Sequence, residues 1–329
     1  MRKPTSLPIS TSPSVYVLHE NNDWMVPLRE AFDRIRLPYT EWFIDGGHLE
    51  LEGLPPLGVF YNRMSASSHS RDHRFAVEMS EPLIAWLESH NRRVINGRRA
   101  LQLEVRKFEQ YLSLKQFGIP VPKTTAACGR ASILEAAASF DRKEWIFKPN
   151  RGGKGLDVQL LRSMDEVTQK IDQLASLSLD GITLIQEYIQ PAGEIITRLE
   201  FIGGKFLYAV EVDASKGFEL CPADSCATGD AFCPVGDEAT NSQSKFKVLR
   251  DFRDDELIRK LEAFFQANKI EVAAAEFLEN HRGERFVYDI NTNTNYNRQA
   301  ERDAGDQKQG MAAIAELLQR EFEKQFVSV

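Results

Sequence analysis

Residues 145–155 read WIFKPNRGGKG, and this stretch decides how the rest of the chain is interpreted. Three apolar residues lead into Lys148; a proline, three glycines and two further cations follow, and an apolar run over 156–161 leaves the loop. The pattern predicts a strand, a glycine-rich hairpin and a second strand. Glycines let backbone N–H groups approach a ligand closely, and such donors beside lysines suit phosphate oxygens. The stretch therefore predicts a flexible flap over a triphosphate, with a basic surface hairpin as the alternative.

Composition limits the classes of protein to which the chain can belong. It has 329 residues, of which 42% are hydrophobic and 27% charged, as is ordinary for a globular protein of several domains. The net charge of −7 argues against a nucleic-acid partner. No apolar run approaches the roughly 20 residues that span a bilayer, and four cysteines are too few for a disulfide scaffold. The sequence thus predicts a cytoplasmic protein that binds neither membrane nor nucleic acid.

The first part of the chain predicts a tail and a small α/β unit. Residues 1–14, rich in Ser, Thr and Pro, are expected to form a disordered tail. The unit over 15–97 has strands at 15–18, 59–61 and 93–97 and helices at 25–34 and 76–90. The polar segment 65–74 follows the second strand and holds several Arg and His residues. It is expected either to contact a ligand or to form a solvated loop.

Residues 98–181 predict a subdomain that contains the glycine loop. One amphipathic helix is predicted over 98–117, because its apolar residues recur three and four positions apart and Gly118 and Pro120 follow. Lys107 lies beside the apolar row of this helix. The other elements are strands at 145–147 and 156–161 and helices at 132–140 and 163–175, the last opening with a capping box.

Residues 182–329 predict a larger subdomain. Its first strand, 182–189, becomes polar at its end and leads into a linker whose backbone groups can bind an adenine edge. The other elements are strands at 194–202, 205–212, 271–278 and 284–291 and helices at 254–269 and 308–324. The irregular segment 214–247 is long enough to be functional. Its cysteines Cys221, Cys226 and Cys233 lack zinc-site spacing and are expected to be incidental thiols.

The last two strands predict a metal site. A hairpin centred between Arg282 and Gly283 places Glu276 opposite Asp289, and alternation of side chains puts Asn291 on the same face as Asp289. Like charges directly opposite each other destabilise a sheet, which argues against a purely structural pair. Two carboxylates and an amide oxygen suit Mg²⁺ bound to nucleotide phosphates, with Mn²⁺ as an alternative ion. A solvated face of the sheet is the other interpretation.

Four segments give the chain a likeness to a known family. They are QFGIPVPKT at 116–124, FKPNRGGKG at 147–155, LIQEYI at 184–189 and DIN at 289–291, with Glu276 upstream. In this order they resemble ATP-grasp proteins of the glutathione-synthetase and ribosomal-S6-glutamate-ligase type. The likeness covers about 98–329, and 15–97 resembles the smaller domain that precedes that fold. It implies an α/β fold, of the α+β kind, in which two subdomains clasp ATP.

The resemblance also implies a role for individual residues. Those implied to bind ATP are Lys107, Lys148 and Lys154 near the phosphates, Gln186, Glu187, Tyr188 and Ile189 around the adenine, and Glu194 near the ribose. Those implied to hold Mg²⁺ are Glu276, Asp289 and Asn291. Arg198 and Lys148 are implied to be catalytic, with Arg198 facing the transferred phosphoryl group. The family's usual ending of the metal strand is replaced by NTNTNYN at 291–297, so substrate assignments are not carried over.

The implied reaction joins a carboxylate to an amine, or to a thiol, through an acyl phosphate with release of ADP and phosphate. The partners would be a small carboxylate and an amine from an amino acid or a peptide; the oligomeric state, including a homo-oligomer, is left open. Arg63, Asn293 and Arg298 are predicted to contact the acid, because arginine forks match carboxylates. Their two segments are expected to face one cleft, closed by 214–247. A small-molecule kinase and a non-catalytic nucleotide-binding regulator are the alternatives.

Overall fold

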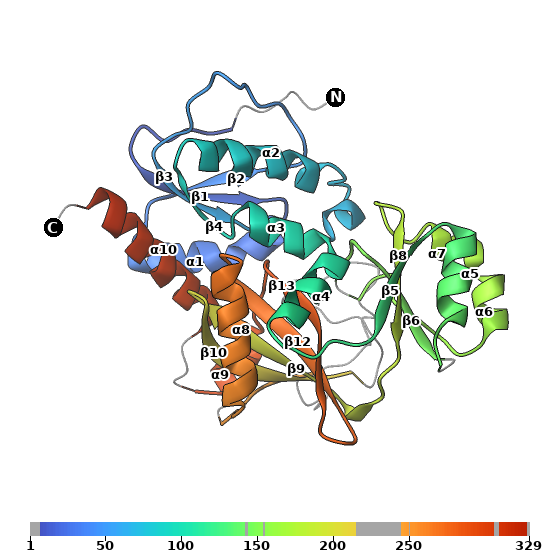
Figure 1. The fold of residues 1–329 in the computed structure, drawn as a ribbon. Coiled ribbons are helices and arrows are strands. Elements are labelled where there is room, and N and C mark those ends of the chain that lie inside the picture. Colours follow the sequence, from blue (N-terminus) through green and yellow to red (C-terminus); the bar gives the residue numbers. More distant parts are fainter. Residues whose placement is uncertain are drawn as a thin grey trace, which may run out of the picture.

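The computed structural model describes residues 7–141, 144–153, 155–214, 245–249, 251–305 and 309–327. Three β-sheets organise these residues, each covered by helices, and Figure 1 shows them as an upper blue layer, a green lobe at the side and a lower sheet in yellow and orange. Within the described residues, no helix combines the length and apolar character needed to cross a membrane. Lys154 and the cysteines at 221, 226 and 233 lie outside the described residues.

The first sheet is parallel and buried on both faces. Its strands, in the order β2-β1-β3-β4, are β1 (Ser14–His19), β2 (Tyr39–Phe43), β3 (Gly58–Asn62) and β4 (Arg93–Ile95). Side chains of β1 alternate between the faces: Val15 and Val17 pack toward α1 (Val26–Ile35) and α10 (Gly310–Phe326), and Tyr16 and Leu18 toward α2 (Ala76–Ser89). Two short 3-10 helices, η1 (Asp23–Met25) and η2 (Ser68–Arg71), follow β1 and β3. Near-continuous apolar strands are what a sheet covered on both faces requires.

The start of the chain differs from its prediction in part. Ser14 already belongs to β1, and Pro8, placed in the predicted tail, accepts a hydrogen bond from the Trp42 indole at 2.7 Å. Residues 1–6 lie outside the described residues. A segment of polar composition can lie on a domain when a buried tryptophan needs an acceptor for its N–H group.

The second sheet carries the glycine loop. Its antiparallel strands, in the order β5-β8-β6-β7, are β5 (Thr124–Cys128), β6 (Trp145–Pro149), β7 (Gln159–Leu161) and β8 (Ile182–Glu187). Helices α5 (Arg130–Ala138), α6 (Met164–Gln169) and α7 (Ile171–Ala175) cover its outer face (Figure 1). Trp145 and Phe147 pack under these helices, so alternation turns Ile146 and Lys148 to the opposite face. Strand β8 is hydrogen-bonded to β5 and β6. The subdomain boundary predicted between 181 and 182 would therefore cut β8 off from its own sheet.

The third sheet is antiparallel and lies below the first. Its strands, in the order β11-β10-β9-β12-β13, are β9 (Pro191–Ile202), β10 (Lys205–Asp213), β11 (Phe246–Leu249), β12 (Val272–Asn280) and β13 (Arg285–Asn291). Leu199, Ala275 and Phe277 pack against α8 (Asp255–Ala267) on one face. Alternation therefore turns Arg198 and Glu276 to the other face, where α9 (Arg298–Asp303) follows the last strand.

The helix predicted over 98–117 is two helices, α3 (Arg98–Val105) and α4 (Lys107–Gln116). Arg106 between them has non-helical angles of φ −135° and ψ 81°. The first amides of α4 are satisfied by the loop after β6: Lys107 N–H donates to the Asn150 carbonyl at 3.1 Å and Phe108 N–H to its side-chain oxygen at 2.9 Å. The break thus attaches Lys107 to the glycine loop. The helix predicted over 163–175 is likewise divided, at Lys170.

Asn96 joins the first sheet to the third. It is fully buried, and its side chain donates to the carbonyls of Val272 and Thr292 at 2.7 and 2.8 Å and accepts from the amides of Glu271 and Val272. Arg93 adds an ion pair with Glu271, with N–O distances of 2.7 Å and below. The Asn96 carboxamide thus donates two hydrogen bonds and accepts two. These bonds hold the first domain in position over the site described below.

An Asn96→Ala variant is expected to lose about 2–4 kcal/mol of the free energy of unfolding, because several buried main-chain groups lose their partners. Asn96 has φ 55°, a conformation that is unfavourable for alanine, so part of any loss would come from the backbone. Asn91→Ala is the matched control: Asn91 has φ 56° but is exposed. Urea denaturation measures both variants, and equal losses would contradict the role given to the Asn96 side chain.

Candidate active site

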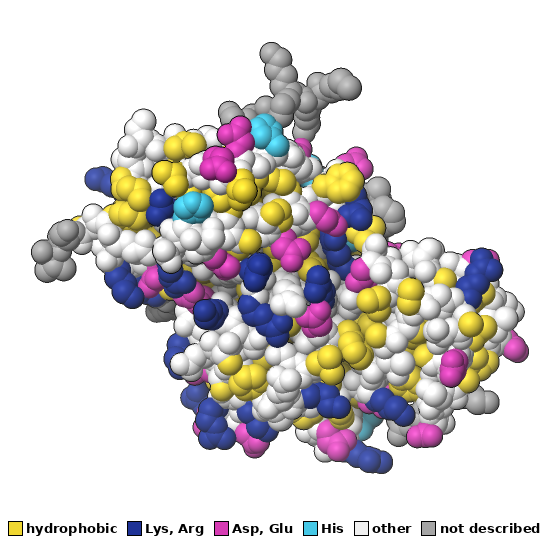
Figure 2. All heavy atoms as spheres, turned by 45° about the horizontal axis from the view of Figure 1, so that its top comes forward, with side chains coloured by type: hydrophobic (Ala, Val, Ile, Leu, Met, Phe, Trp, Pro, Cys, Tyr) yellow, Lys and Arg dark blue, Asp and Glu magenta, His cyan; other side chains and the backbone are white. Residues whose placement is uncertain are grey.

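A cavity of about 370 Å³ lies where the three sheets meet. Its walls come from the loops after β1 and β3, from the junction of α3 and α4, from β6 and the glycine loop, from β8 and the linker after it, and from β9, β12 and β13. The predicted site residues that line it are Lys107, Lys148, Gln186, Glu187, Tyr188, Ile189, Glu194, Arg198, Glu276, Asp289, Asn291 and Asn293. Figure 2 shows the outside of the molecule on one face, where a notch separates two lobes and Lys and Arg side chains gather near the middle.

The hairpin of β12 and β13 has the register that the sequence predicts at its functional end. Glu276 pairs with Asp289, and Asn291 pairs with Ala274. Nearer the turn the ladder is shifted by one residue, because Phe277 pairs with Val287 and leaves Tyr288 as an extra residue. Such a bulge locally re-aims side chains. Tyr288 lines the cavity beside Asp289, and alternation alone would not have placed it there.

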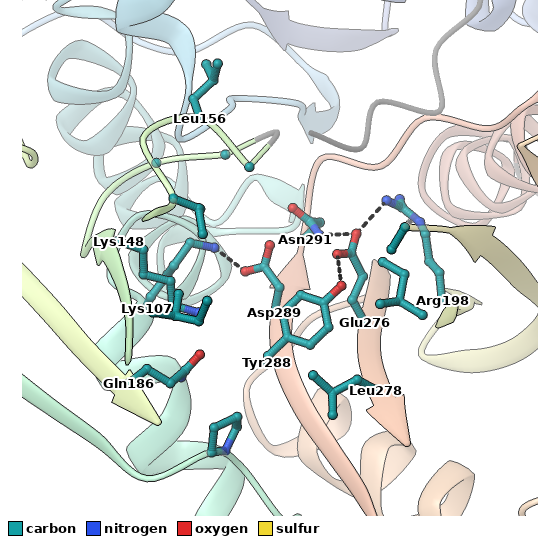
Figure 3. Close-up of a pocket in the computed structure, with 18 of the residues that line it drawn as sticks. Lys107, Lys148, Leu156, Gln186, Arg198, Glu276, Leu278, Tyr288, Asp289 and Asn291 are labelled. Carbon is teal, nitrogen blue, oxygen red and sulfur yellow. Dashed lines mark hydrogen bonds and ion pairs between the residues drawn. The ribbon is translucent and has the colours of Figure 1, made fainter. Parts of the chain in front are cut away.

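Each of the two carboxylates has a cationic partner. Glu276 pairs with the Arg198 guanidinium at 3.0 Å and also accepts hydrogen bonds from the Tyr288 hydroxyl at 3.1 Å and the Asn291 amide at 3.2 Å. Asp289 pairs with the Lys107 ammonium. Burial and the neighbouring Asp289 charge raise the pKa of Glu276. The two negative charges are therefore balanced by Arg198 and Lys107. Figure 3 shows Lys107 and Lys148 on one side of the carboxylates and Arg198 on the other.

Lys148 is in a different situation from Lys107. Its side chain is buried, and its ammonium lies 5.1 Å from the centre of the Tyr111 ring and 5.9 Å from that of the Tyr288 ring. Among the described residues it has no carboxylate partner within ion-pair distance. Burial, and then the charge of Lys107, lower the pKa of Lys148 to about 7. A buried cation without an anion is unfavourable by itself and suits a site that receives a polyanion.

Arg198 is held by a network on the cavity face of β9. Its guanidinium contacts Glu200, Glu276 and the Thr294 hydroxyl, and that hydroxyl lies 3.0 Å from Glu200. Burial alone would lower the pKa of Arg198, but the charges of Glu200 and Glu276 more than offset it, and the pKa is raised. Arg198 therefore stays charged and fixed next to the carboxylate cluster.

The end of β8 and the linker residues 188–190 line one side of the cavity. The Glu187 carboxylate accepts from the Lys123 amide at 2.7 Å, and the Tyr188 amide donates to the Glu144 carbonyl at 3.1 Å. The Glu187 side chain thus stabilises the linker rather than pointing a free carboxylate at a ligand. Gln186 donates to Thr124 at 2.8 Å. Glu194, in the first part of β9, has a left-handed φ of 54°.

The glycine loop lies against the first domain. Arg151, which is 8% exposed, pairs with Glu78 of α2 at 2.6 Å. A Cβ added at Gly153 would come within 3.5 Å of Ser67, so the loop backbone passes close to that residue. The first domain and the loop together close one end of the cavity.

Two predicted substrate contacts lie elsewhere. Arg63 is 2% exposed and does not line the cavity; its guanidinium donates to the Trp24 and Thr294 carbonyls and to the side chains of Asn293 and Asn295. Arg298 borders a separate hollow and pairs with Glu30 of α1 at 2.9 Å. The prediction that these two guanidinium groups point into the shared cleft is therefore wrong, because neither arginine lines the cavity. The loop after β3 and the tail of β13 do share the cavity, as predicted.

Sequence reasoning missed several cavity residues. Trp24 follows β1, and Ser65 and Ser67 lie in the polar segment that was singled out only for its Arg and His residues. Glu104 of α3 accepts from the Thr292 amide at 2.6 Å, and burial raises its pKa. A glutamate inside an amphipathic helix carries no signal of this contact in the sequence.

The oxygen groups of this cavity fit a magnesium ion. Among the described residues there is no group of three or more His, Cys, Asp and Glu side chains arranged for a metal, so an ion here would depend on Glu276, Asp289 and Asn291. These three are hard oxygen donors at one point of the cavity wall. Three protein ligands leave positions for water and phosphate oxygens, which is how Mg²⁺ is usually held with nucleotides.

Curated proteins match part of this chain in sequence. No family model matches the chain. The β subunit of ADP-forming succinate–CoA ligase from Sulfurovum sp. is 28% identical over 101 residues, and that from Bordetella petrii is 32% identical over 101 residues. Each match covers 30% of this chain and 25% of the relative. The chain thus spans about a quarter of the length of these curated relatives.

Solved structures match over nearly the whole chain. An ATP-grasp RimK domain protein from Sphaerobacter thermophilus has 17% identity and a TM-score of 0.63, covering 93% of this chain and 99% of its own. The D-cycloserine synthetase DcsG has 16% identity and a TM-score of 0.64, with 94% and 100% covered. The ATP-grasp ligase PsnB, solved with a minimal precursor, Mg and ADP, has 13% identity and a TM-score of 0.65, with 96% and 100% covered. This protein therefore has the mixed α/β fold of the ATP-grasp ligases over almost its entire length.

Proposed function

We propose that the protein is an ATP-dependent, ADP-forming ligase that joins a carboxylate to an amine, or to a thiol, through an acyl phosphate. One observation carries the proposal: Lys107 and Lys148 lie beside the carboxylates of Glu276 and Asp289 in a single cavity. The ATP-grasp fold of the solved ligases supports the same activity.

The two lysines would hold the phosphates of ATP. An ATP tail carries about four negative charges, and each pair of opposite unit charges at 4 Å contributes about 4 kcal/mol at an effective dielectric constant of 20. Gln186 and the linker backbone would bind the base, and Glu194 would lie near the ribose. Glu276, Asp289 and Asn291 would hold Mg²⁺, or Mn²⁺ in its place. When bound, such an ion offsets negative charge on the phosphoryl oxygens.

The proposed chemistry has two steps. A carboxylate oxygen of the acid attacks the γ-phosphorus, the bond to the bridging oxygen breaks and ADP leaves. The amine nitrogen then attacks the acyl carbon, phosphate leaves, and the amine gives up a proton. Arg198, fixed beside Glu276, is placed to stabilise charge during the first step. PsnB and MdnC were solved with precursor peptides, which makes a peptide a candidate for either substrate here as well.

The number of substrates needed for ADP release tests the proposal. A ligase is expected to need both an acid and an amine for full turnover, a small-molecule kinase only one acceptor, and a non-catalytic nucleotide-binding protein should release no ADP. Hydroxylamine can replace the amine, because it traps an acyl phosphate as a hydroxamate. ADP release coupled to one hydroxyl compound, without hydroxamate from any acid, would contradict the ligase proposal and favour the kinase.

A further inference from the structure

The first-domain end of the cavity is built where a ligand site is expected in a parallel sheet. In the order β2-β1-β3-β4, the connections after β1 and β3 lead to opposite sides, and a crevice opens at the carboxyl ends of those two strands. Trp24 in the first connection and Ser65 and Ser67 in the second all line the cavity. The nucleotide-binding residues named above lie on α4, on the other two sheets and on the linker after β8, so this end is left for the co-substrate.

The tail of β13 faces the same space with two carboxamides whose orientation is fixed by Arg63. The Arg63 Nε donates to the Asn293 Oδ1 at 3.3 Å, and its Nη2 donates to the Asn295 Oδ1 at 2.8 Å. Arginine has only donors, so the atom turned to it must be the amide oxygen. The NH₂ group of each asparagine therefore points away from the Arg63 guanidinium. Neither NH₂ group has a hydrogen-bond partner among the described residues. Both asparagines line the cavity.

Arg71 orients the two serines in a comparable way. Its guanidinium lies over the Trp24 ring at 4.7 Å, forms a fork with the buried Glu20 carboxylate and donates from Nη1 to the Ser67 Oγ at 3.1 Å. The Ser67 and Ser65 hydroxyls lie 2.9 Å apart. Since Ser67 already accepts from Arg71, whichever serine donates to the other leaves one hydroxyl proton to donate elsewhere.

We propose that Ser65, Ser67, Asn293 and Asn295 form a donor wall that binds the carboxylate of the acid co-substrate, and that Arg63 and Arg71 are positioning residues for it. This inference rests on the proposed ligase function and names which substrate binds where. A wall that offers N–H and O–H donors matches an anionic acceptor and rejects an ammonium group. Neutral donors also hold a carboxylate without the strong ion pair that would reduce the nucleophilicity of its oxygen.

Isosteric exchange of one asparagine tests the wall. In Asn295→Asp an oxygen replaces the NH₂ group, so a donor to the substrate becomes a negative charge, whereas the pairing with Arg63 is kept and strengthened. We expect the affinity for the acid to fall about tenfold or more, with the thermal midpoint of the free protein unchanged or raised. A merely structural role would lower stability and leave the affinity unchanged. Asn297→Asp is the matched control, because Asn297 caps α9 and aspartate caps equally well.

The probe is a panel of amino acids and short dicarboxylic acids, each compared with the corresponding carboxamide. Binding is measured as the shift of the thermal midpoint of the protein with Mg-ADP bound. The wild type should be stabilised by at least one acid and not by the matching amide, and Asn295→Asp and Ser67→Ala should lose that response while Asn297→Asp keeps it. Three results would overturn the donor wall: equal responses to acids and amides, an unchanged response in Asn295→Asp, or no response to any acid. Failure to bind Mg-ADP would instead count against the proposed function.

Discussion

A Lys148→Met variant is expected to lose most of its affinity for Mg-ATP and at the same time to become more stable. The ammonium is buried, faces two tyrosine rings and has no carboxylate within ion-pair distance among the described residues. Removing it therefore removes a desolvation cost without leaving an anion unpaired. The methionine side chain has a similar length and fills the same space. An ordinary binding-site substitution would not raise stability.

The stability gained in Lys148→Met should depend on pH. The pKa of Lys148 is lowered from 10.5 to about 7 in the folded protein. The buried ammonium therefore lowers the free energy of unfolding by its full amount below about pH 7, and this cost disappears as the pH rises toward 10.5. The gain from Lys148→Met should follow the same course, with an upper limit of about 5 kcal/mol at low pH, since a change of one in pKa corresponds to about 1.4 kcal/mol. Lys115→Met is the control, because Lys115 is exposed on α4.

Calorimetry with Mg-ATP and urea denaturation at two pH values measure the two effects of Lys148→Met. Wild-type affinity in the folded variant would contradict the phosphate role of Lys148. A loss of stability as large as its loss of affinity would show that the ammonium has a stabilising partner in the free protein.

An Asp289→Asn variant is expected to reduce ATP turnover by about two to three orders of magnitude, because it removes one of the two carboxylates proposed to hold Mg²⁺. The free protein should also become less stable. Relief of repulsion with Glu276 favours the variant, but Lys107, whose side chain is 10% exposed, loses its partner, and breaking a buried pair typically costs about 3–5 kcal/mol. The loss of the ion pair is expected to dominate.

Turnover and the unfolding midpoint should be measured together for this variant. Asp172→Asn is the control, because Asp172 is 70% exposed and pairs with an exposed arginine. A further removal of the charge of Lys107, in Lys107→Met with Asp289→Asn, should recover part of the stability but none of the turnover. Turnover within tenfold of wild type in Asp289→Asn would contradict the metal role.

The carboxylate cluster could be predicted from the sequence because a strand pair has a simple period. Counting from the turn placed Glu276 opposite Asp289, and the structure has that pair. The count near the turn was nevertheless off by one, and the bulge at Tyr288 restores the register. A bulge leaves little trace in a single sequence, so the tyrosine that it turns into the cavity was missed.

Other features depend on contacts between distant segments. Arg106 breaks the predicted helix because Asn150, far along the chain, accepts from the first amides of α4. Arg63 was predicted to contact the acid because an arginine fork matches a carboxylate, but its guanidinium donates to the Trp24 carbonyl and to Asn293, Thr294 and Asn295, the last three more than 200 residues away. Local patterns predict elements and the spacing within one hairpin, whereas the partner of a buried arginine is decided by how sheets pack on one another.

A crystal structure with Mg²⁺ and a non-hydrolysable ATP analogue would show whether this cavity binds the nucleotide. We expect the ammonium groups of Lys107 and Lys148 to lie on phosphate oxygens, Glu276 and Asp289 to bind the ion, and the base to lie against the linker after β8. In that complex the Lys107–Asp289 ion pair should be opened or lengthened, because both groups take new partners. A nucleotide bound away from this cavity, or a metal ion held without either carboxylate, would rule out this cavity as the Mg-ATP site.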